Sequence, residues 1–372
     1  MDSLVIARLQ SVAREHGWQA LLLLSPENVA YATGFVVPSQ PLMRWRHAVC
    51  LVPASGEPSL VVVDMESSTV RDHLPSVEVT TYNEFTDDPM QTLATTLDRL
   101  GLAGASLGVE LEYLPAADFV RLQGFLQLPG ARWEGCDAAV AQARIKKTPA
   151  EIERLRGLSR LTDATIYEAL TSIRAGMTEM DIAGRLTRGI FERAADNFKL
   201  MIVASGERSG YPNVGPTNRV LEPGDLIRTE IFGIQAGYHA GVCRTAVVGQ
   251  PSEEQRRTWS ILIKCRDLVL GEIRPGASAA HIYRLFSDEF ANVGFPPISF
   301  VGHGIGVHLH EEPYIGRYGD ATLEAGTVLG IEPLLYAPGM GLQNKDMVLV
   351  TDDGCELLSN VTPADELIRV PV

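Results

Sequence analysis

One stretch constrains this chain more than any other: residues 224–245, with the sequence GDLIRTEIFGIQAGYHAGVCRT. Two runs rich in β-branched and aromatic residues flank a turn expected at 235–236, so the stretch predicts a β-hairpin. Side chains alternate between the two faces of a strand, which places His239, Gly241 and Cys243 on one face of the second strand. A core face ordinarily carries valine, isoleucine or leucine, so these residues predict the floor of a pocket.

Length and composition predict a protein of two domains. At 372 residues the chain exceeds the usual size of one domain, and 45% hydrophobic residues suffice for sizeable cores. A net charge of −14 argues against a nucleic-acid partner. No apolar run of about 18 residues predicts a membrane span, and the start of the chain lacks the segments that export requires. The five cysteines are odd in number and scattered, which favours a reducing cytoplasm over disulfides or a zinc site.

The first part of the chain, residues 1–140, alternates between helical and strand patterns. The periodicity predicts helices over 4–16 and 88–100 and strands over 20–24, 48–53 and 59–63. Such alternation is typical of an α/β layer domain. The boundary is expected near residues 140–150, which gives domains at 1–142 and 143–372.

The second domain opens with a helix start signal. Thr148 is expected to cap a helix whose first residue is Pro149, and Glu151 completes a capping box. Apolar residues at three- and four-residue spacing then predict helices over 150–174, 179–195, 252–273 and 278–292.

Several motifs along the chain resemble one known superfamily. They are NVAYATG at 28–34, RIKKTPAEIE at 144–153, the hairpin at 224–245, GHGIGVHLHEEP at 302–313 and GIEP at 330–333. Together they resemble the pita-bread superfamily of creatinase, prolidase and aminopeptidase P, over essentially the whole chain. The resemblance implies a creatinase N-terminal-like α/β domain, which would serve dimerisation and substrate access, and an α+β pita-bread catalytic domain. It also implies a homodimer, and a strand-to-loop segment at 28–34.

The peptidases of this superfamily bind two metal ions, and this chain departs from their ligands. The first hairpin aspartate is replaced by Glu230 and the second by Gly241. His303 and Glu332 match ligand positions, but Lys345 stands where the peptidases keep a bridging glutamate. Two carboxylates, an ammonium and a histidine that can be protonated already sum to roughly zero charge. We therefore expect no dinuclear centre and no cofactor.

A single divalent ion such as manganese or cobalt stays open as an alternative. Glu230, His303 and Glu332 would hold it, because two carboxylates and one histidine form a known facial arrangement. Lys345 would repel such an ion at close range, which favours the metal-free pocket.

The hairpin is most similar to the ectoine-hydrolase branch of the superfamily. The shared segments are EI at 230–231, YHA at 238–240 and RT at 244–245. This resemblance implies a hydrolase that opens or cleaves an amide or amidine C–N bond in a small, zwitterionic molecule. Creatinase keeps its catalytic histidine at the position of Asn213. An asparagine exchanges no proton near neutral pH, which argues against the creatine reaction.

The pocket residues have expected roles in this reaction. Glu332 would activate water or attack the substrate, and Glu230 would hold its cationic nitrogen. His303 and His310 would deliver the proton. Lys345 would pair with a carboxylate or steady a developing oxyanion.

Further residues are expected to contact the substrate. They are Asn213, His239 and Cys243 in the second domain and Arg44 and Arg46 in the first. Cys243 is interpreted either as a small apolar residue or as a thiolate activated by a histidine. The segment RWRH at 44–47 is interpreted either as an exposed loop or as a loop that binds a substrate carboxylate in the pocket of a second subunit.

Two other functions remain open. One is a mononuclear-metal Xaa-Pro aminopeptidase or dipeptidase, favoured by His303, His310 and Glu332. The other is a non-catalytic binding protein that keeps the pita-bread shape. Activity that survives chelation favours the metal-free hydrolase, and activation by manganese or cobalt favours the peptidase. Inertness towards amides together with tight binding of a peptide favours the binding protein.

Overall fold

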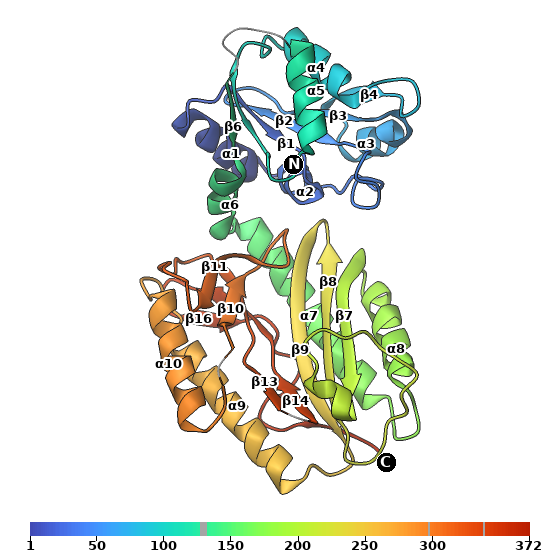
Figure 1. Ribbon diagram of the computed structural model, residues 1–372, viewed down its shortest axis with the longest axis vertical. Helices are drawn as coiled ribbons and strands as arrows, with labels where there is room; N and C mark the ends of the chain where they lie inside the picture. Colours follow the sequence, from blue (N-terminus) through green and yellow to red (C-terminus); the bar gives the residue numbers. More distant parts are fainter. Residues whose placement is uncertain (127–131, 297, 338) are drawn as a thin grey trace. The chain divides into compact units, whose positions relative to one another are not determined.

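The computed structural model describes residues 1–126, 132–296, 298–337 and 339–372. The chain forms two compact units, Met1–Arg144 and Ile145–Val372 (Figure 1). These bounds lie two residues beyond the boundary expected from the sequence. Each unit has its own hydrophobic core.

The N-terminal unit is built on a mixed six-stranded sheet in the order β4-β3-β2-β1-β5-β6. Its strands are β1 (Ala20–Leu23), β2 (Val49–Pro53), β3 (Ser59–Val63), β4 (Glu78–Tyr82), β5 (Ser106–Val109) and β6 (Arg132–Gly135). Its helices are α1 (Ser3–Glu15), α2 (Pro26–Thr33), α3 (Ser67–His73), α4 (Pro89–Arg99), α5 (Ala116–Leu126) and α6 (Asp137–Ile145). The central strands are almost wholly buried, as is typical of a sheet covered on both faces. The expected α/β layer domain is confirmed.

Residues 28–33 belong to a helix and Gly34 caps it, so the expected strand-to-loop segment is wrong. Helix α2 follows Ser25, whose hydroxyl accepts a hydrogen bond from the N–H of Asn28, and Pro26 stands in its first turn. It ends at Gly34, whose φ of 73° lies in the left-handed region that glycine favours. These local start and stop signals specify the helix.

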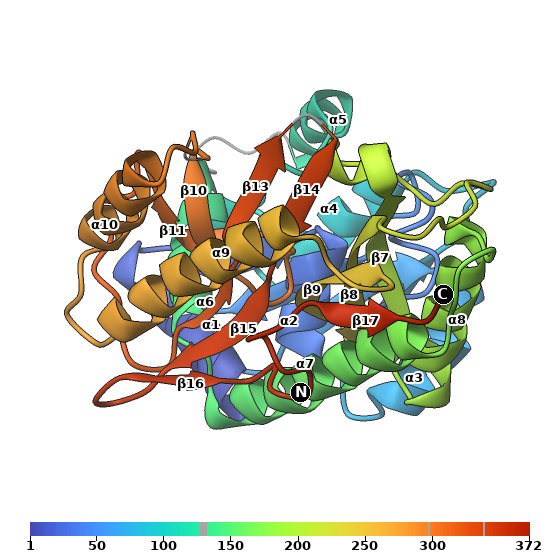
Figure 2. The ribbon, with the colours of Figure 1, turned by 90° about the horizontal axis from the view of Figure 1, so that it is seen from below.

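The C-terminal unit contains two larger sheets and a two-stranded hairpin. The sheets have the orders β17-β9-β8-β7 and β11-β10-β12-β15-β16, and the hairpin is β13-β14. The strands are β7 (Asn197–Ser205), β8 (Leu226–Gln235), β9 (Tyr238–Val248), β10 (Phe300–Gly304), β11 (Glu311–Gly316), β12 (Val328–Ile331), β13 (Leu334–Ala337), β14 (Met340–Gln343), β15 (Asp346–Val350), β16 (Cys355–Leu357) and β17 (Ile368–Val370). Near the C-terminus, β17 runs parallel to β9 (Figure 2).

Four long helices cover these sheets. They are α7 (Pro149–Thr171), α8 (Glu179–Glu192), α9 (Glu253–Glu272) and α10 (Ala279–Asn292), each within three residues of its expected bounds. The capping box of Thr148 and Glu151 is present at the start of α7. Helices α7 and α8 pack on the first sheet, and α9 and α10 share a core with the second (Figure 1). The expected α+β domain is confirmed.

The hairpin predicted at 224–245 is formed by β8 and β9. Its turn consists of Ala236 and Gly237, with φ values of 49° and 83°, one residue later than expected. Two successive positive φ values are typical of the tight turns that match the twist of a hairpin. The backbone of Cys243 exchanges hydrogen bonds of 3.2 and 3.0 Å with that of Lys345, which brings the segment before β15 onto the hairpin.

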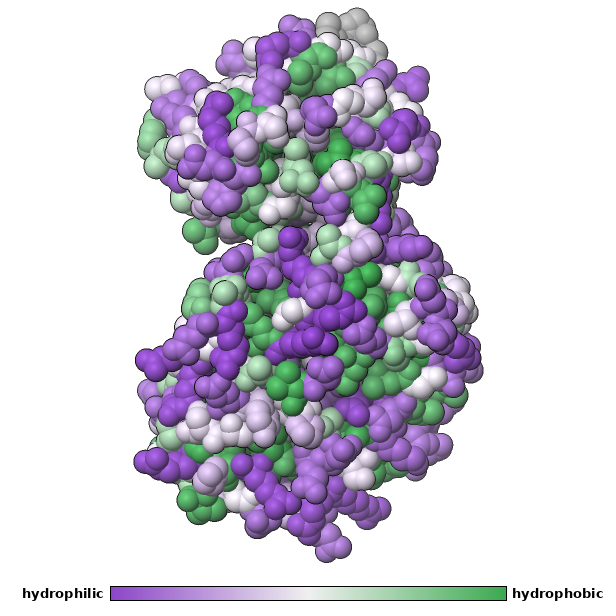
Figure 3. Space-filling view, turned by 180° about the vertical axis from the view of Figure 1, so that it is seen from behind, coloured by the Kyte–Doolittle hydropathy of each residue, from purple (hydrophilic) through white to green (hydrophobic). Residues whose placement is uncertain are grey.

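No helix within the described residues is long and apolar enough to cross a membrane. The face drawn in Figure 3 intersperses hydrophilic residues with apolar ones.

Candidate active site

Four ionisable side chains from separate strands meet at the β8–β9 hairpin. They are Glu230 within β8, His303 within β10, Glu332 directly after β12 and Lys345 directly before β15, and each is at most 5% exposed. Strand β12 pairs with both β10 and β15, which brings the last three together. Gly330 leaves room for them, because a Cβ there would lie 3.2 Å from Cε of Lys345 and 3.3 Å from the ring of His303.

The ammonium of Lys345 joins the two glutamates. Its Nζ lies 3.2 Å from Oε1 of Glu230 and 3.1 Å from Oε2 of Glu332. Burial alone would lower the pKa of Lys345, but the two carboxylates outweigh it and raise the pKa. Burial alone would raise the pKa of Glu332, but Lys345 and His303 outweigh it and lower the pKa to about 2. The pair is therefore charged at neutral pH.

Two residues that sequence reasoning missed, Gln343 and Arg228, extend this network. Nε2 of Gln343 donates to Glu230 at 3.2 Å and to Glu332 at 3.3 Å. Its Oε1 accepts a hydrogen bond of 2.9 Å from Arg228, which is wholly buried. Arg228 stands two residues before Glu230 in the same strand, and Gln343 two residues before Lys345. Strand alternation was the signal that could have found them.

Arg228 also anchors the loop that carries Asn213. Its second terminal nitrogen donates to the carbonyl oxygens of Tyr211 and of Pro212, the latter at 2.8 Å. Asn213 itself is exposed in this loop. The network thus ties the glutamates to the loop backbone, whereas the role of the Asn213 side chain stays a prediction.

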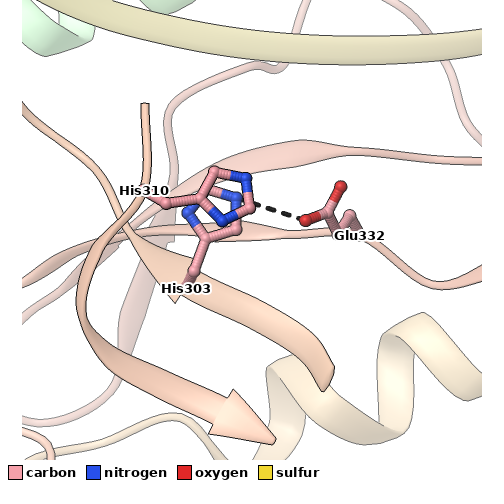
Figure 4. Close-up of side chains that lie close together, drawn as sticks. All are labelled: His303, His310 and Glu332. Atoms are coloured by element: carbon pink, nitrogen blue, oxygen red, sulfur yellow. Dashed lines mark ion pairs between the residues drawn. The ribbon is translucent and has the colours of Figure 1, made fainter. Parts of the chain in front are cut away.

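His303 and His310 form a parallel stack beside Glu332 (Figure 4). Their ring centroids are 3.7 Å apart and their planes differ by 9°. Nδ1 of His303 faces the carbonyl oxygen of Gly304 at 2.7 Å and so donates to it, which leaves Nε2 facing Oε1 of Glu332 at 3.2 Å. His310 is the exposed member. Contact with its neighbours removes part of the hydration of its ring, and this desolvation, together with the charges of His303 and Lys345, lowers the pKa of His310 to about 4. The ring is therefore neutral at pH 7.

This donor set does not fit a dinuclear metal centre. The nitrogen of Lys345 lies between the carboxylates of Glu230 and Glu332, where an ion bridging them would have to lie. A protonated amine has no lone pair for a metal. Gly241 supplies no donor, and the ring of Phe232 fills the space beside it.

The donor atoms of this site do not fit a single metal ion either. The donor atoms of His303, His310 and Glu332 lie within 4.8 Å of one another, which makes them the nearest approach to a ligand set within the described residues. A histidine binds a metal in the plane of its ring, at about 2.0–2.1 Å for zinc. Two near-parallel rings whose centroids are 3.7 Å apart have no point between them that lies in both ring planes. The alternative set with Glu230 in place of His310 is divided by Lys345.

The hairpin residues Cys243 and His239 are inside the protein. Cys243 is wholly buried, and its burial together with the charge of Glu230 raises the pKa of the thiol well above its ordinary value. This favours the small apolar residue over the thiolate. His239 is 2% exposed, and its backbone N–H donates to the carbonyl of Gly306 at 2.7 Å.

Arg44 and Arg46 lie in the N-terminal unit and have partners there. Arg46 pairs with Glu84 at 2.7 Å, and Arg44 donates to the carbonyl oxygen of Tyr113 at 2.9 Å. Their contact with substrate stays a prediction.

Arg244 fixes the backbone behind the site. It forms buried ion pairs with Asp163 at 3.0 Å and with Asp346 at 2.9 Å. It also donates to the carbonyl oxygen of Lys345 at 2.8 Å. Thr245 donates to the carbonyl oxygen of Gln343 at 2.8 Å. Both hairpin residues therefore hold the segment that carries Lys345.

Comparisons with known proteins agree on one family. Residues 153–352 match metallopeptidase family M24, and residues 6–146 match the creatinase/prolidase N-terminal domain. The chain is 28% identical to a probable dipeptidase PepE of Mycobacterium tuberculosis, over 100% of this chain and 98% of that protein. It is 26% identical to an Xaa-Pro dipeptidase of Lactobacillus helveticus, over 76% of this chain and 78% of that protein.

Solved structures agree with this assignment. The crystal structure of dipeptidase PepE from Mycobacterium ulcerans has a TM-score of 0.83 at 28% identity, over 100% of this chain and 98% of that one. An X-Pro aminopeptidase from Thermotoga maritima has a TM-score of 0.87 at 24% identity, over 98% and 99% of the two chains, which shows the fold alone. This chain therefore belongs to metallopeptidase family M24, with a creatinase/prolidase N-terminal domain before a pita-bread domain, and is a hydrolase that acts on C–N bonds.

Proposed function

We propose that this protein hydrolyses a C–N bond in a small, zwitterionic, peptide-like molecule without a dinuclear metal centre. The observation that carries the proposal is the buried ammonium of Lys345, 3.2 and 3.1 Å from the carboxylates of Glu230 and Glu332. This fixed cation and a histidine that can be protonated, His303, together balance the charge of the two acids, as metal ions do in a dinuclear site. A site already balanced in charge favours a substrate with little net charge.

The exposed imidazole of His310 is the best-placed general base in this proposal. Glu332, whose pKa is held near 2, is a weaker base than His310, whose pKa is about 4, and His310 is the one that solvent can reach. Oε1 of Glu332 contacts neither Lys345 nor Gln343 and faces Nε2 of His303 at 3.2 Å, so Glu332 positions the inner ring of the histidine stack.

The reaction then proceeds by general base and general acid steps. Water gives a proton to the imidazole of His310 while its oxygen attacks the carbonyl or amidine carbon. The C–N bond breaks as the same proton passes from His310 to the leaving nitrogen. This proposal gives His310 the role expected of Glu332, which was to activate water or attack the substrate. Glu230, expected to hold the cationic nitrogen of the substrate, instead holds Lys345 and Gln343 in place.

The test is turnover of a panel of Xaa-Pro dipeptides, cyclic amides and cyclic amidines by the purified protein, before and after treatment with a chelator. The proposal expects at least one substrate of the panel to be cleaved at the same rate after chelation. Loss of that activity on chelation, with recovery on adding Mn²⁺ or Co²⁺, would overturn it.

A metal-dependent Xaa-Pro dipeptidase is the second candidate. The names of the similar proteins favour it, since they are dipeptidases and Xaa-Pro dipeptidases over most of this chain. The donor geometry favours the first candidate, because Lys345 and the parallel histidines leave no common point for an ion. The panel above separates the two.

A further inference from the structure

The ring of Phe232 fills the place where a side chain at position 241 would stand. Phe232 and Gly241 are paired directly across β8 and β9. A Cβ added to Gly241 would lie 2.3 Å from Cε1 of that ring and 2.7 Å from both Cδ1 and Cζ. Atoms cannot approach so closely, so any side chain at 241 requires the ring to move.

The same ring lies against the ammonium of Lys345. Nζ is 4.5 Å from the ring centroid, and the two side chains are 0% and 1% exposed. The negative face of an aromatic ring attracts a cation, most strongly when water is excluded. A lysine ammonium has three N–H donors. The carboxylates of Glu230 and Glu332 engage two of them, and the ring of Phe232 covers a further side.

We propose that Phe232 is a positioning residue that holds the ammonium of Lys345 between the two glutamates and closes the ligand position at 241. Positions 232, 241 and 345 then act as one unit. The glycine admits the ring, the ring holds the ammonium, and the ammonium takes the place of an ion. The inference concerns how the site is built and does not depend on which C–N bond the protein cleaves.

A double-mutant cycle on stability tests the contact between ring and ammonium. Phe232→Leu keeps an apolar side chain but removes the aromatic face. We expect it to lower the urea midpoint by roughly 0.3 M more in the wild type than in Lys345→Met. A ring that serves packing alone would give equal decreases in both backgrounds, and that result overturns the proposal. Phe290→Leu, in the core below the second sheet, is the matched control and should give equal decreases.

Binding of Mn²⁺ alone tests the closure of position 241. Gly241→Asp with Lys345→Glu restores two carboxylates, but the ring still fills the space beside 241. Adding Phe232→Ala opens that space, so calorimetry should show at least tenfold tighter Mn²⁺ binding by the triple variant than by the double variant. Equal affinities would contradict the closure.

The matched control replaces Phe290 by alanine in the same double variant and should bind Mn²⁺ no better than the double variant. Circular dichroism checks that each variant is folded. If the triple variant does not fold, the stability cycle decides the proposal by itself. Neither readout uses turnover, so a failure of the proposed reaction and a failure of this inference can be told apart.

Discussion

At the scale of single residues, Lys345 is the side chain on which the site depends most. Lys345→Met leaves Glu230 and Glu332 buried without their cation, and breaking a buried pair in this way costs about 3 kcal/mol of unfolding free energy. Urea unfolding at pH 7 measures the loss. Lys264→Met is the matched control, since Lys264 pairs with Glu289 while 74% exposed, and solvent-exposed ion pairs contribute little to stability. Similar losses in both variants would contradict the account.

His310 sets the expected pH dependence of activity. The reaction needs its neutral imidazole, and protonation removes that form as the pH falls through a pKa of about 4. The acidic limb of kcat/KM should therefore lie near pH 4 and not near the ordinary histidine value of about 6.5. His310→Ala should lower kcat by about 10²-fold or more. The neighbouring His308→Ala is the control and should retain most activity. An acidic limb near pH 6.5 in the wild type would contradict the role of His310 as the base.

At the scale of elements, the turn of the β8–β9 hairpin carries strain that can be relieved. Ala236 has a φ of 49°, a region that costs a residue with a Cβ about 1 kcal/mol and that asparagine tolerates better. Ala236→Asn should raise the free energy of unfolding by about 0.5 kcal/mol, without change in activity. Thermal and urea unfolding measure the difference. A lower midpoint in the variant would contradict the presence of backbone strain at Ala236.

The elements were predictable from sequence where the signals are local. Apolar periodicity, together with the cap at Thr148, predicted the long helices to within three residues, and the two β-rich runs around a turn predicted the hairpin. Helix α2 also has local signals, in Ser25, Pro26 and Gly34, but the family resemblance of residues 28–34 implies a strand-to-loop segment instead. The contacts of Gln343 and Phe232 were not predictable, since they depend on how separate strands meet and on the space that Gly241 leaves open.

At the scale of the whole molecule, the two units are expected to fold separately. Each has its own core, and most contacts of a residue lie within its own unit. Residues 1–144 expressed alone should therefore show a cooperative urea transition and the circular dichroism of an α/β protein. A transition without cooperativity in this fragment would contradict the division. The homodimer implied by the family resemblance stays a prediction.

The central claim is that a fixed ammonium replaces metal ions between Glu230 and Glu332. Calorimetric titration of Mn²⁺ into chelator-treated wild-type protein at pH 7 tests it most directly, with Glu230→Gln and Glu332→Gln as variants that locate any site. The account predicts that Mn²⁺ does not bind stoichiometrically at these two glutamates, so that neither substitution removes a binding event. One or two Mn²⁺ ions bound per chain, and lost in both variants, would contradict it.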